Sequence, residues 1–148
     1  MTPLPLRLMP GDDLRRALES AVAGEGCRAA FVLSGIGSLG ATKLRLAGAE
    51  HAIDVVGAVE ILTLSGSIAV GGSHLHASVS DAAGRVLGGH VGYGCTVRTT
   101  AEVLLALLPG WRFTREADPV TGFDELMPTR AETAPAAMPT APPRPHSR

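Results

Sequence analysis

A predicted β-hairpin over residues 74–90 limits the fold of this chain more than any other segment. Polar and apolar residues alternate strictly from His74 to Ser80. Because successive side chains on a strand point to opposite faces, this segment is predicted to be a half-buried strand with one polar face. The residues that follow, Asp81-Ala82-Ala83-Gly84-Arg85, suit a hairpin loop in which a type I turn is closed by a left-handed glycine.

This loop predicts the register of the two strands. If Asp81 pairs with Arg85, His76 lies opposite His90. Directly opposed residues share a face, so His74, His76 and His90 are predicted to gather on the polar face. A loop longer by one residue would send His90 to the apolar face instead. The predicted cluster therefore depends on the turn.

Three neighbouring imidazoles suit a divalent transition metal that keeps an open coordination position. Gly88 and Gly92 are predicted to flank His90 on the same face and to leave space around the rings. The alternative is a polar face whose histidines are solvated or hydrogen-bonded to nearby hydroxyl groups, and the spacing alone leaves both interpretations open. His51 and His146 have no such context, and we interpret both as solvated.

The length of 148 residues allows one domain with a hydrophobic core. Hydrophobic residues make up 45% of the chain but aromatic residues only 3%, so the core is predicted to consist of Ala, Val, Leu and Ile. Residues 1–127 are assigned to this domain. Residues 128–148 hold six of the 11 prolines and are predicted to form a disordered tail.

The charge balance disfavours a general nucleic-acid binder. The formal net charge is −1, and the predicted tail contributes +2, which leaves −3 for residues 1–127. A strongly basic balance is typical of proteins that bind the phosphate backbone. Six basic residues could still form a local patch, although we interpret them as solvated: Arg15, Arg16, Arg28, Lys43, Arg45 and Arg98.

The two cysteines indicate a reducing compartment. Cys27 and Cys95 lie far apart in the sequence and form no CxxC pair. We find neither a signal peptide nor a membrane-spanning apolar run, so a cytoplasmic location with reduced thiols is predicted. Both cysteines are interpreted as small buried hydrophobic residues.

Hydrophobic periodicity predicts one helix among many strands. Apolar residues recur at helical spacing from Leu14 to Val22, after a turn at residues 10–13, and Gly24 and Gly26 end the helix. Strands are predicted over residues 4–9, 28–34, 39–46, 53–56, 59–64, 68–70, 95–99 and 111–114. Residues 101–108 suit either a strand or a helix.

The segment from Gly35 to Gly40 matches the pattern G-x-G-x-x-G of dinucleotide-binding proteins. That site needs a helix opening at the last glycine, whereas residues 41–46 alternate like a strand. We therefore interpret the segment as a glycine-rich connection between strands. The chain has no nucleophile elbow and no Walker A motif. Glu60 and Glu102 are candidate proton-transfer groups or further ligands, or else surface carboxylates.

Several short motifs occur together in an order typical of one family. They are Arg7 to Leu14 (RLMPGDDL), Ser34 to Leu39 (SGIGSL), Glu60 to Gly66 (EILTLSG), His74 to His76 (HLH) and Gly88 to His90 (GGH). On these motifs the chain resembles a stand-alone prokaryotic member of the PPC (plants and prokaryotes conserved) domain family. The resemblance covers roughly residues 4–126.

The resemblance implies a single α+β domain with a curved, mainly antiparallel β-sheet and few helices that assembles as a homotrimer. It also implies a zinc ion on the histidines of the HLH and GGH segments, here His74, His76 and His90. Bacterial members are commonly described as candidate DNA-binding proteins. The family also resembles acetolactate decarboxylase in fold, an enzyme with zinc on a comparable set of histidines.

Two classes of function follow from these features. The first is a trimeric binding or regulatory protein associated with DNA or with partner proteins. The second is a metal-dependent enzyme, similar to a lyase or decarboxylase, that acts on a small molecule. A third interpretation, a structural metal or a cluster that binds an anion, also stays open. Plant relatives bind DNA through AT-hooks, but Pro143-Arg144-Pro145 lacks the core of that motif.

Overall fold

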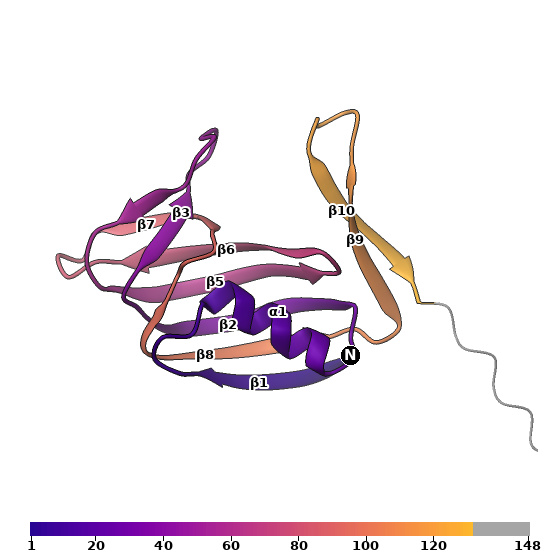
Figure 1. The fold of residues 1–148 in the computed structure, drawn as a ribbon, viewed down its shortest axis with the longest axis horizontal. Helices are drawn as coiled ribbons and strands as arrows, with labels where there is room; N and C mark the ends of the chain where they lie inside the picture. The colour runs from indigo at the N-terminus through magenta and orange to yellow at the C-terminus, as the bar shows by residue number, and fades with distance from the viewer. Residues whose placement is uncertain (132–148) are drawn as a thin grey trace, which may run out of the picture.

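The computed structural model describes residues 1–131, which form a main sheet, one helix and a separate hairpin (Figure 1). The main sheet has eight strands in the order β1-β8-β2-β5-β6-β7-β3-β4, and β9 pairs only with β10. The elements are β1 (Thr2–Leu8), α1 (Leu14–Gly24), β2 (Ala29–Leu39), β3 (Thr42–Arg45), β4 (Ile53–Val55), β5 (Val59–Ala69), β6 (Gly72–Ser80), β7 (Val86–Val91), β8 (Val97–Leu107), β9 (Trp111–Ala117) and β10 (Asp124–Arg130).

Every pairing between strands is antiparallel, which confirms the predicted mainly antiparallel sheet with few helices in a single domain. In the described part of the chain, the 11 residues of α1 form the single helix, and no helix is long and apolar enough to cross a membrane.

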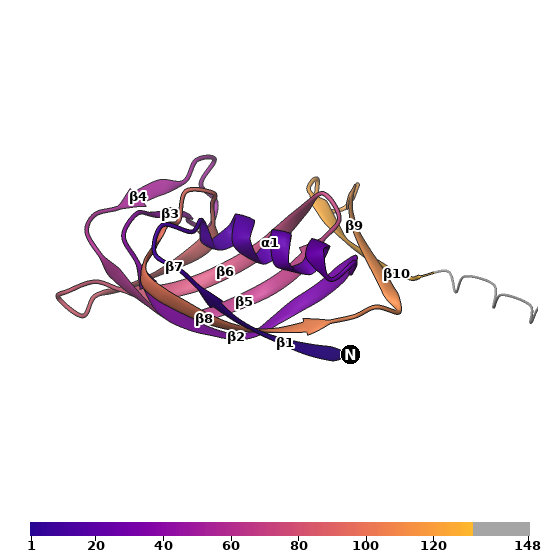
Figure 2. The ribbon, with the colours of Figure 1, turned by 60° about the horizontal axis from the view of Figure 1, so that its bottom comes forward.

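Helix α1 covers one face of the curved sheet (Figure 2). It begins where the side chain of Asp13 accepts a hydrogen bond from the backbone N–H of Arg16, which is the usual contact of an N-cap residue. Its apolar side, Leu14, Leu18 and Val22, is buried against the sheet. Apart from Cys95, the core between them consists of aliphatic side chains, as the composition predicts.

The predicted hairpin is confirmed in both turn and register. The backbone N–H of Asp81 donates to the carbonyl of Arg85, and Gly84 has a φ of 76° in the left-handed region. The side chain of Asp81 strengthens the loop by accepting from the backbone N–H of Ala83 and from the guanidinium of Arg85. His76 pairs directly with His90.

Some boundaries differ from the sequence predictions. Residues 59–69 form one strand, β5, and residues 97–107 form one strand, β8, so each joins two predicted segments. Residues 35–39 lie inside β2 and not, as predicted, in a connection between strands. The next element is a strand, β3, and not the helix that a dinucleotide-binding site would need. Strand β10 was not predicted. It includes Pro128, Thr129 and Arg130 of the predicted tail, and residues 132–148 lie outside the described residues.

The two cysteines and His51 agree in part with the burial predicted for them from the sequence. Both cysteines are free, and Cys95 is fully buried in the core. Burial raises the pKa of the Cys95 thiol, which keeps it protonated and unreactive. Cys27 is only half-buried, and its thiol donates to the carbonyl of Ala29. His51 is exposed, as predicted, and His146 lies outside the described residues.

The sheet face opposite α1 carries the histidines at one side and apolar side chains at the other. We call the second area the uncovered apolar face. It consists of four exposed residues from three neighbouring strands: Leu33, Ile36, Leu62 and Leu104. Ile36 is 54% exposed and Leu33 is 53% exposed, although both lie within a strand of the main sheet.

The hairpin of β9 and β10 reaches over the same face near the histidines. It stands away from the plane of the main sheet (Figure 1). The ring of Phe113 in β9 packs edge-on against Phe31 of β2, with ring centroids 5.4 Å apart. Phe31 pairs with Ser67 of β5, which in turn pairs with His74 of β6. The hairpin is therefore anchored beside the row of residues that contains His74.

Candidate metal centre

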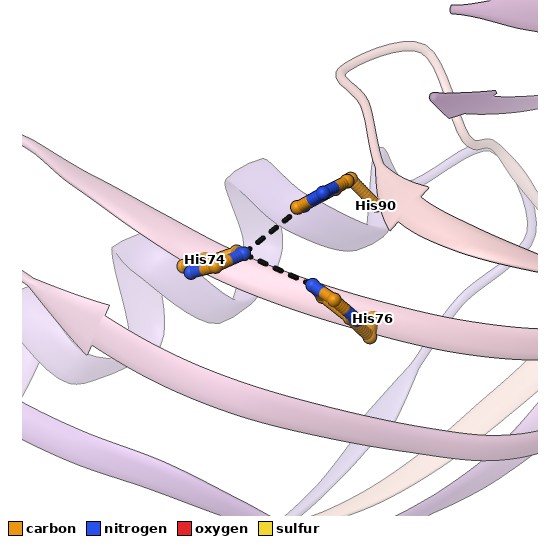
Figure 3. A group of neighbouring side chains, drawn as sticks. All are labelled: His74, His76 and His90. Carbon is orange, nitrogen blue, oxygen red and sulfur yellow. Dashed lines mark hydrogen bonds between the residues drawn. The ribbon is translucent and has the colours of Figure 1, made fainter. Parts of the chain in front are cut away.

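Three histidines from two neighbouring strands meet on the polar face of the sheet. His74 and His76 come from β6 and His90 from β7, and their rings point toward one another (Figure 3). We call these three residues the histidine cluster. His74 and His90 are half-buried, and His76 is exposed.

The distances in the cluster are close to those of a metal centre. His74 Nε2 lies 3.0 Å from His90 Nδ1 and 3.0 Å from His76 Nε2. One nitrogen from each ring can be chosen so that all three lie within 4.8 Å of one another. In a tetrahedral zinc site with bonds of about 2.0–2.1 Å, two ligand nitrogens are roughly 3.3 Å apart. Small rotations of the rings would bring the three nitrogens to that spacing.

Hydrogen bonds alone cannot pair all the ring nitrogens that face one another in the cluster. A neutral imidazole nitrogen carries either one hydrogen or one lone pair. His74 Nε2 faces nitrogens of both His76 and His90, so it cannot make a full hydrogen bond with each of them. A cation placed between the rings would use all three lone pairs at once.

The surroundings hold two of the imidazoles in the neutral form that binds metal. Burial lowers the pKa of His74, and the neighbouring Arg115 and His76 lower it further, while Glu125 opposes them. Burial also lowers the pKa of His90, together with the charge of Arg45. A neutral imidazole offers the lone pair that a metal requires, so these shifts favour metal binding at neutral pH.

The glycines near the cluster have a different role from the predicted one. A Cβ at Gly88 would lie 3.2 Å from the carbonyl oxygen of Ala77, and one at Gly92 would lie 3.3 Å from that of Lys43. The space is thus occupied by neighbouring backbone rather than left open around the rings. These glycines allow β7 to approach the strands on either side of it.

The two predicted carboxylates lie away from the cluster. Glu60 pairs with Ser80, four residues along β6 from His76, or about 13 Å at the usual rise of a strand. Glu102 lies in β8, three strands from β6 in the sheet, or roughly 14 Å at the usual strand spacing. The structure therefore brings the three histidines together but not the two glutamates.

Three charged residues that the sequence did not single out for this site lie near it. Arg45 of β3 pairs directly with His90, and Arg115 of β9 donates through Nη2 to Ser67 Oγ at 2.9 Å. Glu125 of β10 acts on His74 by its charge. Arg45 reaches the site through a strand pairing and Arg115 through a hydrogen bond, in both cases between segments distant in sequence, so local spacing carries no signal for them.

The family comparison agrees with the observed fold. The family described as the Plants and Prokaryotes Conserved (PCC) domain matches residues 1–109. Among curated proteins, two that are named bifunctional protein GlmU, from two Synechococcus strains, are 43% and 48% identical over 150 and 124 residues. The matched region covers 94% and 82% of this chain but only 24% and 19% of those proteins, so the chain spans about a quarter of their length or less.

Three solved structures share the fold. A hypothetical protein from Salmonella cholerae-suis is 39% identical, with a TM-score of 0.83 and coverage of 87% of this chain and 94% of that chain. A metal-containing protein from Archaeoglobus fulgidus is 27% identical, with a TM-score of 0.72 and coverage of 86% and 94%. A candidate DNA-binding protein from Ralstonia eutropha is 27% identical, with a TM-score of 0.66 and coverage of 83% and 89%.

Proposed function

Since this chain belongs to the Plants and Prokaryotes Conserved domain family, we propose that it is a binding protein whose His74, His76 and His90 hold one divalent metal ion, with zinc expected. The observation that carries this proposal is the convergence of three ring nitrogens within 4.8 Å. Imidazole nitrogen is among the preferred ligands of zinc and related transition metals. The similarity to a metal-containing protein from Archaeoglobus fulgidus supports the same assignment.

The ligand set leaves a coordination position open. Among residues 1–131, no Asp, Glu or Cys joins the histidine cluster. Three protein ligands with a free fourth position are typical of catalytic rather than structural zinc sites. Zinc in such a site polarises a bound carbonyl group or lowers the pKa of a bound water.

This open position favours a second candidate function, a metal-dependent enzyme of the lyase or decarboxylase type that acts on a small molecule. Glu125 joins Glu60 and Glu102 as a proton-transfer candidate, because its charge raises the pKa of His74. Its place on β10, outside the main sheet, would let it face a molecule bound at the histidines.

Elemental analysis of the purified chain, together with its mass in solution, tests the metal proposal. We expect about one zinc ion per chain, and we expect removal with a chelator to be reversible by added zinc. A protein that is purified without metal and that does not take up Zn²⁺, Co²⁺ or Ni²⁺ would contradict the proposal.

We further propose that the chain assembles as a homotrimer through the uncovered apolar face. Leu33, Ile36, Leu62 and Leu104 are exposed on neighbouring strands, where isolated subunits would leave them in water. Contiguous exposed apolar side chains of this kind are typical of interfaces between subunits.

Placing a charge in this face should break the assembly. We expect Ile36→Glu to change the solution mass from that of a trimer to that of a monomer, because the carboxylate would be buried without a partner. Light scattering after size-exclusion chromatography measures the mass. Val86→Glu is the matched control, since Val86 is a 58% exposed residue of β7, two strands away from β5, the nearest strand of the uncovered apolar face. An unchanged mass for Ile36→Glu would exclude this face as the interface.

Association with DNA is the third element of the proposal, and it is supported by the similarity to a candidate DNA-binding protein. A gel shift with duplex DNA over a range of salt concentrations tests it. Binding through phosphate contacts should weaken by about 10³-fold or more between 50 and 200 mM salt if six or more contacts form. The net charge of −3 over residues 1–127 predicts fewer contacts and weak binding. Absence of any shift at low salt would remove DNA from the function.

A further inference from the structure

Two arginines border the histidine cluster on opposite sides. Arg45 of β3 pairs with His90 of β7, and His90 pairs with His76 of β6. Directly paired residues share a face of the sheet, so these three side chains form one row across three strands. Arg45 therefore lies on the same face as the histidines, at the β3 side, and its guanidinium donates to the carbonyl of Ala49.

Arg115 enters the site from the other side. Its strand, β9, crosses near the row of His74, where Phe113 packs against Phe31. The guanidinium of Arg115 donates to the hydroxyl of Ser67, and Ser67 is the direct strand partner of His74. Ser67 is 5% exposed, so the arginine is tethered at a buried point beside the ring.

Both guanidinium groups lack a carboxylate partner. In residues 1–131 the ion pairs are Arg15–Glu19, Lys43–Asp54 and Arg85–Asp81. Arg45 and Arg115 are held instead by neutral acceptors, and each guanidinium has five N–H donors, so most of its donors stay free.

The charges of the site are not balanced by the protein. With a divalent metal on three neutral imidazoles, the metal and two arginines would bring a charge of about +4 close together. Glu125, whose charge opposes these cations at His74, would offset one of them and leave about +3. Cations at such short range repel one another unless an anion lies between them.

We propose that the site binds a small carboxylate whose carboxyl group meets the guanidinium of Arg115, while a second oxygen of the molecule, from a hydroxyl, keto or further carboxyl group, occupies the open position of the metal. This inference rests on the proposed metal site and names the class of ligand that the site takes. The planar fork of a guanidinium matches a carboxylate in two parallel hydrogen bonds. Arg45 is the second anchor, on the far side of His90. A metal and an arginine would together orient a hydroxy or keto acid.

Cobalt provides a direct test. Chain loaded with Co²⁺ is titrated with lactate and with malonate, and the visible absorption of the metal is followed. We expect a saturable spectral change with each acid and none with lactamide or malonamide, which have similar shapes but no charge. Inorganic phosphate and a short DNA duplex are titrated in parallel. A response to these two alone would overturn the carboxylate assignment.

Substitutions at Arg115 then test its role in carboxylate binding. We expect Arg115→Met to weaken carboxylate binding at least 10-fold and to strengthen Co²⁺ binding, because one repelling charge is removed. Arg115→Lys, which keeps the charge but loses the fork, should weaken carboxylate binding while leaving Co²⁺ affinity near that of the original chain. Arg98→Met, at an exposed arginine of β8, is the control and should change neither value.

The two proposals fail in different ways. A chain that does not bind Co²⁺ would disprove the metal site, and this inference with it. A chain that binds Co²⁺ in one equivalent but shows no response to either acid would disprove the carboxylate site alone. Equal carboxylate binding by the original chain and Arg115→Met would exclude Arg115 as the anchor.

Discussion

Replacing His76 with Ala is expected to reduce the metal content from about one ion per chain to less than a tenth. The ion would lose one of three protein ligands, and loss of even a residue that only orients a ligand lowers metal affinity by about 10–100-fold. We therefore expect the affinity for zinc to fall by more than 100-fold. Elemental analysis after dialysis against a fixed free zinc concentration measures the effect.

The exposed position of His76 makes this variant informative. His76 is the exposed member of the histidine cluster, so its removal should leave no cavity in the core. The thermal midpoint without metal should therefore change little. With zinc present, the original chain should be stabilised and the variant should not, because a ligand stabilises only the state that binds it.

A matched control separates the cluster from histidines in general. His51 is also exposed but lies in the loop before β4 and is not part of the cluster. His51→Ala should keep its full metal content. If His76→Ala also keeps its full metal content, then the three histidines are not the ligands.

The histidine cluster could be predicted from sequence because it depends on one local hairpin. The turn from Asp81 to Arg85 fixes the register of two strands that are adjacent in sequence, and alternation then places every side chain. The N-cap at Asp13 and the helix that follows are local in the same way. Predictions of this kind need no knowledge of the rest of the sheet.

The positions of Arg45 and Arg115 beside the histidine cluster could not be predicted, because they depend on how distant strands are arranged. Arg45 reaches His90 only because β3 pairs with β7, and no local pattern indicates that pairing. Arg115 lies one residue beyond the predicted strand 111–114 and reaches Ser67 from a hairpin outside the main sheet. The second strand of that hairpin was missed because its last three residues fall in the predicted tail and include Pro128, which fits only an edge strand.

Gly66 explains another error of the sequence prediction. Ser65-Gly66 indicated a break between two strands, yet β5 continues through it. Gly66 has a φ of 138°, outside the range of ordinary residues, and its strand partner Leu75 lies between His74 and His76. The glycine thus marks a close approach of β5 to β6 rather than a turn.

Replacing Gly66 with Ala is expected to be among the most destabilising single changes in the sheet. The new Cβ would overlap the carbonyl oxygen of His74 and lie 2.8 Å from the Cα of Leu75, so the backbone of β6 would have to move. Backbone strain and overpacking each cost about 1–3 kcal/mol, and we expect a total of about 2–6 kcal/mol. The free energy of unfolding in urea, measured without metal at one protein concentration, gives the value.

Gly72→Ala separates the two causes. Gly72 has a similar φ of 150°, but a Cβ there would approach nothing closer than the Arg15 guanidinium at 3.6 Å. This control should show the backbone strain without the collision, and so a loss of about 1–3 kcal/mol. Equal losses for the two variants would mean that β5 and β6 are not in close contact at Gly66. Because the displaced carbonyl belongs to His74, Gly66→Ala should also weaken zinc binding, whereas Gly72→Ala should leave it unchanged.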